Sequence, residues 1–573
     1  MIKELTIRNE RIDDTPLLMA HIKRMKIPWL LNECFPTHGN WAGLKLGWAA
    51  AGWLCHILSK GDHRMSHVQQ WAEKRLETLS NCMERLVRAL DFSDDCLTLI
   101  LRALSDDARW ETFERKLNGH LLRVYPLNPR KVRIDTTTCS GYWDVTPEGL
   151  FQFGFSKDHR PDLPQAKVVL STLDPLGMPV ATDIVSGNRA DDPLYIPAIR
   201  RIQASLQTQG LLYIGDVKMS AKETRAFVAA SGDFYLSPLS KVQVPEEELD
   251  RYLAPVWTGE QELIPIHREN AAGERELIAE GYERQVPMTA EVEGSTVQWT
   301  ERRLVIRSLK QTRAAETRLR KKLEQAQAAL EALNKRGRGK KRYRSLVELR
   351  QAAEELVKKH RVEGLLNLGF SVMFHRRQVR RYGDRPTRTV VEKACHVVVV
   401  VNQVAVREAL RRKGWRVYAT NAPQSELPLS QAVLAYRDQY IVERSCGRLK
   451  GRPLSLRPMY LQRDDHATGL IRLLTIGLRI LTLLEFVVRK RLAEEETELA
   501  GVYAGNPKRS TARPSAELLL EAFKEITLTV VREHHRRLHH LTPLSNPQKR
   551  ILALSGFSPE IYTSLCAQSS KPP

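Results

Sequence analysis

The chain has 573 residues, with 89 Lys and Arg against 67 Asp and Glu and a formal net charge of +22. This length allows roughly two to four domains. The excess of basic residues favours a polyanionic partner, with nucleic acid first, over an ordinary basic protein that has no such partner.

The composition also argues against several classes of protein. The eight cysteines form no C-x-x-C pair, which disfavours a zinc site and suits a reducing compartment. The first residues lack the apolar stretch of a signal peptide. The most apolar run, residues 469–488, is interrupted by Arg472, Arg479 and Glu485, so it is predicted to be a core helix. We expect a cytoplasmic protein with no membrane partner.

Residues 1–125 are predicted to be a helical N-terminal domain. Leu86, Leu90, Leu97 and Leu101 follow the spacing of one helical face within residues 82–104. A cluster of tryptophans nearby is more often part of a core than a ligand platform. We expect this domain to bind DNA ends, although it shows no clear helix-turn-helix signature.

The periodicity changes at Lys131, and residues 126–240 are predicted to be the first part of a sheet domain. The segment Asp192-Pro193 is typical of a helix start. The order of elements indicates a mixed α/β sheet and not a series of βαβ units. The predicted strands are residues 131–136, 150–155, 167–173, 179–185, 211–215 and 233–237, with a helix at 192–206.

Residues 241–425 differ in composition and are predicted to be a large α+β insertion domain. Leucine and alanine recur at heptad spacing in residues 319–333 and again in residues 346–356, which predicts an antiparallel helical hairpin. The hairpin tip is strongly basic, and the pattern leaves open whether it contacts phosphates or forms a solvated loop. The candidate DNA contacts in the tip are Lys335, Arg336, Arg338, Lys340 and Lys341.

Residues 426–492 are predicted to complete the sheet domain. Residues 436–450 are expected to form one helix, on which Tyr436, Gln439, Glu443 and Lys450 share a face. An acid on a basic helix is usually a solvated ion pair when it stands alone. The remaining residues, 493–573, are predicted to be a helical region, with a last helix near 515–537 and a candidate role in dimerisation.

Three acids have special placements in these predicted elements. Asp135 lies inside an apolar strand, Asp216 follows another, and Glu443 lies on the late helix. Carboxylates in such positions are costly unless they are paired or bind metal. Three converging carboxylates suit Mg²⁺ or Mn²⁺, and two such ions about 3.5–4 Å apart can activate water and stabilise the leaving oxygen of a phosphodiester.

The segments around these acids, Ile134-Asp135-Thr136-Thr137, residues 213–220 and residues 436–450, resemble those of bacterial insertion-sequence transposases of the DDE type. The resemblance covers roughly residues 11–565. It implies a ribonuclease-H-like core in which Asp135, Asp216 and Glu443 are the catalytic, metal-binding acids. It also implies that the long interval between Asp216 and Glu443 contains the insertion domain of that family.

The late helix resembles the Tyr-x2-Arg-x3-Glu-x6-Lys signature of the same family. Tyr436, Glu443 and Lys450 match it, whereas Gln439 stands where many members have Arg. The resemblance implies DNA contacts by residues of this helix and an aromatic side chain in the insertion domain that stacks on a flipped base. The candidate DNA contacts are Tyr436, Gln439 and Lys450 of this signature, the nearby Arg437 and Arg444, and Trp299 as the aromatic residue of the insertion domain.

The activity implied by the resemblance is Mg²⁺- or Mn²⁺-dependent cleavage at transposon ends, followed by strand transfer into target DNA. The implied partners are double-stranded DNA, both terminal inverted repeats and target, and a second copy of the chain on that DNA. A cut-and-paste route through a DNA hairpin is expected. The alternatives are a catalytically silent, transposase-derived DNA-binding protein and a nuclease that cuts but never joins.

Overall fold

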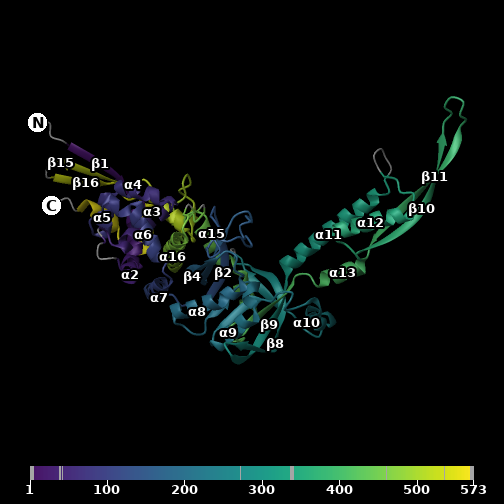
Figure 1. Cartoon of the computed structure of the whole chain (residues 1–573), viewed down its shortest axis with the longest axis horizontal. Helices are drawn as coiled ribbons and strands as arrows, with labels where there is room; N and C mark the ends of the chain where they lie inside the picture. The colour runs from purple at the N-terminus through teal and green to yellow at the C-terminus, as the bar shows by residue number, and fades with distance from the viewer. Residues whose placement is uncertain are drawn as a thin grey trace. The chain divides into compact units, whose positions relative to one another are not determined.

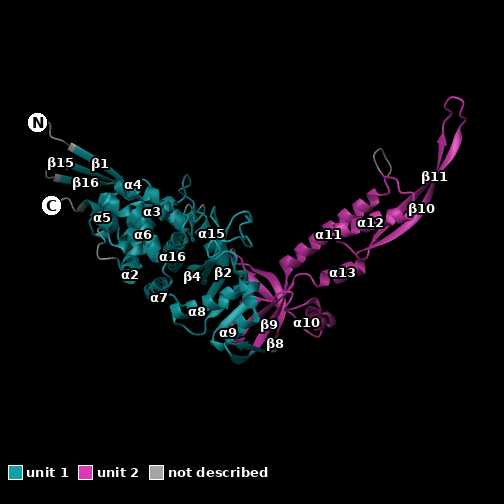
Figure 2. Cartoon of the chain, viewed as in Figure 1, with its two compact units in different colours: residues 1–237, 287–299, 435–573 teal, residues 238–286, 300–434 magenta. Residues whose placement is uncertain are grey.

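The computed structural model describes residues 5–37, 41, 43–270, 273–335, 341–457, 459, 461–533 and 536–567. The chain divides into two units (Figure 2). Unit 1 contains residues 1–237, 287–299 and 435–573, and unit 2 contains residues 238–286 and 300–434. The chain therefore leaves unit 1 twice and returns to it twice.

Within unit 1, the strands of the central sheet lie in the order β4-β3-β2-β5-β6 (Figure 1). β3 pairs antiparallel with β2 and β4, whereas β5 pairs parallel with β2 and β6. This mixed order confirms the predicted ribonuclease-H-like class of the core. The strands are β2 (Lys131–Ser140), β3 (Gln165–Leu173), β4 (Met178–Ser186), β5 (Leu212–Ile214) and β6 (Phe234–Pro238).

The predicted strand at residues 150–155 is wrong. Only Gln152 pairs there, in an isolated bridge with Gln165. Phe151 is buried against Trp143, but Phe153 and Phe155 are 55% and 83% exposed, so these two have no sheet face to cover. Apolar composition without a packing partner does not form a ladder.

The N-terminal part of unit 1 is helical, as predicted, and packs around one long helix, α16 (Asp464–Glu494). Residues 469–485 of α16 are all buried, which confirms the predicted core helix. A Cβ at Gly469 would lie 2.1 Å from the carbonyl oxygen of Leu101, so glycine permits the close approach of α6. The N-terminal helices are α1 (Thr15–Arg24), α2 (Ile27–Cys34), α3 (Leu46–Lys60), α4 (Val68–Glu73), α5 (Leu76–Met83), α6 (Asp94–Leu104) and α7 (Asp107–Val124).

No helix in the described part of the chain combines the length and the apolarity that crossing a bilayer requires. In α16 the charged side chains that interrupt the apolar run are themselves buried. Arg472, Arg479 and Glu485 are 2%, 0% and 4% exposed, so the protein interior must supply their partners.

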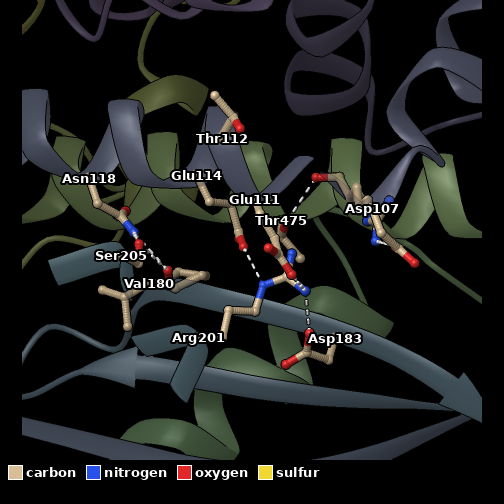
Figure 3. Close-up of polar contacts among 12 residues, drawn as sticks. Asp107, Glu111, Thr112, Glu114, Asn118, Val180, Asp183, Arg201, Ser205 and Thr475 are labelled. Carbon is tan, nitrogen blue, oxygen red and sulfur yellow. Dashed lines mark hydrogen bonds and ion pairs between the residues drawn. The ribbon is translucent and has the colours of Figure 1, made fainter. Parts of the chain in front are cut away.

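A buried ion-pair network supplies partners for Arg479 and joins α7, α8 (Tyr195–Leu206), α16 and β4 (Figure 3). Glu114 of α7 is 1% exposed and accepts a hydrogen bond of 2.6 Å from Arg479. The guanidinium of Arg201, on α8, lies 3.4 Å from Glu114 and also donates to Asp183 of β4. One carboxylate with two guanidinium partners therefore ties three helices to the edge of the sheet.

The two ends of the chain meet in a small sheet of order β1-β15-β16, where the C-terminal helix prediction fails (Figure 1). The helix expected near 515–537 is only α17 (Ala516–Glu521), followed by β15 (Thr527–Glu533) and β16 (Arg536–Leu541). Buried Leu528 and Val530 alternate with more exposed neighbours, and β1 (Leu5–Arg11) supplies the partner strand. Helices α18 (Asn546–Ser555) and α19 (Glu560–Ala567) follow.

Unit 2 consists of a sheet part and a helical hairpin that supports a β-ribbon; residues 287–299, which end β8 and begin β9, belong to unit 1. Its sheet strands lie in the order β12-β9-β8-β7, and buried Leu323, Ala326 and Leu330 of α11 pack with Ala353 of α12 in the predicted hairpin. The elements are α10 (Glu246–Thr258), β7 (Ile264–Glu269), β8 (Arg275–Val292), β9 (Ser295–Ser308), α11 (Leu309–Ala332), α12 (Leu346–His360), β10 (Leu366–Val379), β11 (Arg388–Val401), α13 (Gln403–Arg411) and β12 (Trp415–Thr420).

The Glu114–Arg479 pair leads to a stability prediction. Arg479→Met leaves a buried carboxylate with one guanidinium partner fewer, and breaking a buried ion pair from one side typically costs about 3–5 kcal/mol. We expect urea unfolding, followed by tryptophan fluorescence, to shift to lower urea by the corresponding amount. Lys490→Met, on the same helix but 47% exposed, is the control.

A double variant sharpens this test. Glu114→Gln combined with Arg479→Met removes both charges, so it should recover part of the stability lost by Arg479→Met alone. An Arg479→Met protein as stable as the Lys490→Met control would show that the network does not hold the helices to the sheet.

Candidate active site

Asp135 and Asp216 lie at the same level of the central sheet. In the parallel ladder of β2 and β5, the last pair is Arg133 and Ile214. Asp135 and Asp216 each follow two residues later, so the parallel register carries the two acids to neighbouring positions where β5 ends. The structure thus brings together two acids that are 81 residues apart in the sequence (216 − 135).

Asp216 is held in place by groups around it. It caps a short 3₁₀ turn (Val217–Ser220), and its Oδ1 accepts hydrogen bonds from the backbone N–H of Lys218 at 2.8 Å and the hydroxyl of Tyr195 at 2.7 Å. Burial, and then the neighbouring Asp216 carboxylate, raises the pKa of Tyr195 well above its ordinary value. Tyr195 therefore remains a hydrogen-bond donor that orients Asp216.

Glu443 lies on helix α15 (Tyr440–Lys450), which packs on β2 and β3. Ser445 of this helix donates a hydrogen bond of 2.8 Å to the carbonyl oxygen of Gly177, in the turn between β3 and β4. A Cβ at Gly177 would lie 2.6 Å from the Ser445 hydroxyl, and its φ of +72° also favours glycine. These contacts hold the exposed Glu443 side chain on the side of the sheet that α15 covers.

Arg133 fixes the chain that leads into α15. It is fully buried on β2 and pairs with Asp174 at 3.1 Å, and it also donates a hydrogen bond of 2.7 Å to the carbonyl oxygen of Ala435. One side chain, two residues before Asp135, therefore links the central strand to the segment that carries Glu443.

The expected single helix over residues 436–450 is wrong. The chain forms α14 (Leu429–Arg437) and then α15, with a turn at Asp438 and Gln439. Tyr436 thus belongs to a different helix from Glu443 and Lys450, and Gln439 is the residue that precedes α15. Of the four residues that were predicted to share one helical face, only Glu443 and Lys450 lie on α15.

The three acids interact electrostatically. The pKa of Asp135 is raised to about 6, first by burial and then by the negative charges of Asp216 and Glu443, against the opposing effect of Lys157. The side chain of Asp135 is 20% exposed, so it is accessible from one side. A carboxylate with a pKa raised in this way, beside two others, is typical of a functional site.

Lys157 supplies positive charge at the same place. Its ammonium lies 3.8 Å from Asp135 and 3.7 Å from Asp191, and it donates a hydrogen bond of 2.6 Å to the carbonyl oxygen of Thr136. The next residue, Asp158, is bound by Lys450 and Arg457, each at 2.7 Å. Lys450 therefore fixes the segment that presents Lys157 to Asp135.

The donor chemistry fits a divalent cation, although the side chains form no ready-made ligand set. Among the residues that the structure describes, no three carboxylate, imidazole or thiol groups come close enough together to hold a metal ion. Yet the charges of Asp216 and Glu443 act on Asp135, and carboxylate oxygens are ligands that suit Mg²⁺ or Mn²⁺. The Lys157 ammonium offsets part of this negative charge.

The predicted DNA contacts are distributed over both units, and several have partners within the protein. Arg444 of α15 pairs with Glu485 at 3.1 Å, and the indole N–H of Trp299 donates to the Tyr235 hydroxyl at 2.9 Å. Gln439 has a buried side-chain oxygen with no hydrogen-bond partner in the described part of the chain. Tyr436 and Arg437 lie on α14, Lys335 and Lys341 are exposed, and Arg336, Arg338 and Lys340 lie outside the described residues.

Four residues of the site were not expected from the sequence. Lys157, Asp158, Asp191 and Tyr195 lie on loops and a helix start whose local sequence resembles ordinary surface segments. For Lys157 and Asp158 the only sequence signal is charge within residues 157–162, and a charge run is usually solvated. Asp191 and Tyr195 flank the helix start at Asp192-Pro193, which by itself indicates no site. The tertiary structure alone places them beside Asp135 and Asp216.

One of the comparisons with known proteins identifies a family. A family model described as a transposase DDE domain matches residues 164–479, more than half of the chain, and includes Asp216 and Glu443 but not Asp135. No curated protein matches the sequence. Among solved structures, a piggyBac transposase synaptic complex with hairpin DNA is weakly similar, with 7% identity and a TM-score of 0.33, over 97% of this chain and 82% of that chain.

The raised pKa of Asp135 predicts a pH-dependent gain in stability for Asp135→Asn in metal-free protein. Well below the ordinary value of 3.8 the carboxyl is protonated in both the folded and the unfolded chain, so the variant should match the wild type. Between the ordinary value of 3.8 and about 6 only the unfolded chain ionises, so the wild type loses stability as the pH rises. Above that window, Asp135→Asn should be more stable by about 1–3 kcal/mol.

Urea unfolding in the presence of a chelator, at pH 4, 5, 6 and 7, would measure this effect. Asp144→Asn, at an exposed position, is the matched control. A stability difference between Asp135→Asn and the wild type that stays the same at every pH would contradict the raised pKa of Asp135.

Proposed function

The chain belongs to the family of transposases with a DDE domain, and from this we propose that it cleaves DNA at transposon ends and joins the cleaved ends to target DNA. Asp135, Asp216 and Glu443 are the proposed catalytic acids. The observation that carries this proposal is the parallel register that brings Asp135 beside Asp216, with Glu443 on the helix that packs on β2. Burial raises the pKa of Asp135, and the charges of Asp216 and Glu443 raise it further. Three acids from separate parts of the chain are thus close enough to interact.

The residues of this site have distinct proposed roles. Asp135, Asp216 and Glu443 would hold divalent cations, Mg²⁺ or Mn²⁺, which at such sites supply an activated water and stabilise the leaving oxygen of the phosphodiester. Tyr195 and the N–H of Lys218 orient Asp216. Lys157 neutralises part of the negative charge beside Asp135, and it can donate to a DNA phosphate from that position.

The contacts of α15 divide the signature residues into two groups. Lys450 and Arg444 have carboxylate partners within unit 1, so we assign them first to holding the site together. Gln439, which precedes α15, remains our candidate on this segment for a contact with DNA, because its amide NH₂ can donate a hydrogen bond to a phosphate. As in the sequence-based expectation, two copies of the chain on two DNA ends are the proposed active form.

Substitution of the three acids tests the proposal. Asp135→Ala, Asp216→Ala and Glu443→Ala should each reduce Mg²⁺-dependent cleavage of duplexes that carry the sequences bordering the gene. The loss should exceed about 100-fold, the upper end of the loss typical for groups that only support metal ligands. Glu148→Ala, at an exposed acid outside the site, should cleave like the wild type.

Two further outcomes separate this proposal from its alternatives. Wild-type cleavage by all three variants would exclude these residues as the catalytic acids. Binding of the same duplexes without any Mg²⁺-dependent cleavage would favour a silent DNA-binding protein. Cleavage without joining, when pre-cleaved ends and target DNA are supplied, would identify a nuclease.

A further inference from the structure

The ribbon of β10 and β11 extends past the helices that support it (Figure 1). The two strands pair antiparallel without interruption from Leu366 opposite Val401 to Val379 opposite Arg388. The base of the ribbon is apolar, and buried Cys395 and Val397 pack there with Leu349 of α12. We call residues 373–394 the outer ribbon, because they lie beyond Val372 and Cys395, the last pair in that apolar cluster.

The outer ribbon is strongly basic and exposed. It has seven cationic side chains and two acidic ones, Asp384 and Glu392, which gives a net charge of +5 (7 − 2). Glu392 pairs with Arg342, outside the outer ribbon, at 3.4 Å. None of the seven cations has a carboxylate partner among the described residues. All are exposed: Arg376, Arg377, Arg380, Arg381, Arg385, Arg388 and Lys393.

The strand register places these charges on both faces of the ribbon. Arg376 and Arg377 are consecutive on β10, so their side chains point to opposite faces, and Arg388 and Lys393 of β11 are likewise on opposite faces. Arg380, Arg381 and Arg385 add charge at the tip. A ribbon that carries cations on both faces and at its tip has no side suited to a protein core.

Without a binding partner, this arrangement lowers the stability of the folded protein. An isolated two-stranded ribbon is marginally stable in water, and its like charges repel one another. Lysine or arginine on an edge strand also discourages pairing with other strands, but a few charges suffice for that purpose. The side chains of Phe374 and Tyr382 are 68% and 87% exposed. Protection of the strand edges against pairing does not require such exposed aromatic side chains.

We propose that the outer ribbon binds double-stranded DNA by entering a groove. A two-stranded ribbon fits the major groove of B-DNA, which is about 12 Å wide. Cations on both faces would then meet the phosphates on both walls of the groove. This inference rests on the proposed function for its partner, DNA, and adds a second surface that holds the duplex separately from the acids of unit 1.

Charge also selects DNA over a second copy of the chain as the partner. Two outer ribbons, each with a net charge of +5, repel each other, whereas a duplex carries one negative charge per about 1.7 Å of its axis. Binding that depends on phosphates is sensitive to salt in a predictable way, and this makes the proposal measurable.

The test compares two quadruple variants with the same reduction in charge. Arg376→Gln, Arg377→Gln, Arg380→Gln and Arg381→Gln are combined in one variant of the full chain. The control combines Arg313→Gln, Arg320→Gln, Lys321→Gln and Lys322→Gln, which are exposed positions on α11. Circular dichroism checks that both variants fold.

The measurement is the affinity for a 40-base-pair duplex of arbitrary sequence at several salt concentrations. The slope of log K against log salt should become shallower by about 0.9 for each phosphate that the variant no longer neutralises, so by up to about 4 in the ribbon variant. The control should keep the wild-type slope. A ribbon variant with the wild-type slope, or a control whose slope changes as much, would overturn the proposal. Dimers that form without DNA in the wild type and are lost only in the ribbon variant would also overturn it.

The same proteins separate this inference from the proposed function. If Asp135→Ala loses cleavage while the ribbon variant binds DNA like the wild type, the ribbon inference fails and the proposed function stands. If no protein cleaves but the ribbon variant alone loses its salt dependence, the ribbon inference stands and the catalytic proposal fails.

Discussion

The burial of Asp135 close to other carboxylates is the constraint on which the architecture around the candidate site depends. Asp135, Asp216 and Glu443 come from three separate segments, and the charges of the other two acids add to the effect of burial in raising the pKa of Asp135. A fold can hold such groups together only if surrounding groups offset the repulsion and fix each backbone segment. Lys157 offsets charge, Tyr195 and a backbone N–H fix Asp216, and Lys450 fixes the segment of Lys157 through Asp158.

Buried arginines fix distant segments of the chain to one another. Arg133 ties the central strand to the chain that enters α15, and Arg479 ties α16 to α7 through Glu114. Each brings together segments roughly 300 or more residues apart along the chain, and their carboxylate partners, Asp174 and Glu114, are nearly buried. Well-packed apolar residues of similar volume are often as stabilising as buried ion pairs. The ion pairs, however, specify which groups meet, and this specificity decides which distant segments of the chain come together.

The sequence predicted the parts of the fold that depend on local pattern. The apolar run around residues 469–488 was sufficient to predict α16, and the strand around Asp135 was predicted from the change of period at Lys131. The prediction failed where a partner elsewhere decides the structure. Residues 527–533 form a strand because β1, some 520 residues earlier, pairs with them. The turn at Asp438 and Gln439 interrupts a segment whose helical periodicity is continuous. Lys157 has no local signal, since its role depends on the position of Asp135.

The division of unit 1 into separate stretches of chain has a consequence for how the protein is made. Helix α16 packs against α6 and β4, yet it is synthesised only after all of unit 2 has been translated. The N-terminal helices and the first strands must therefore wait, with apolar faces uncovered, while more than 200 further residues are translated. Such late, long-range closure is slow and exposes the nascent chain to aggregation. Unit 2, whose hairpin and ribbon make mostly local contacts, can acquire its structure during this interval.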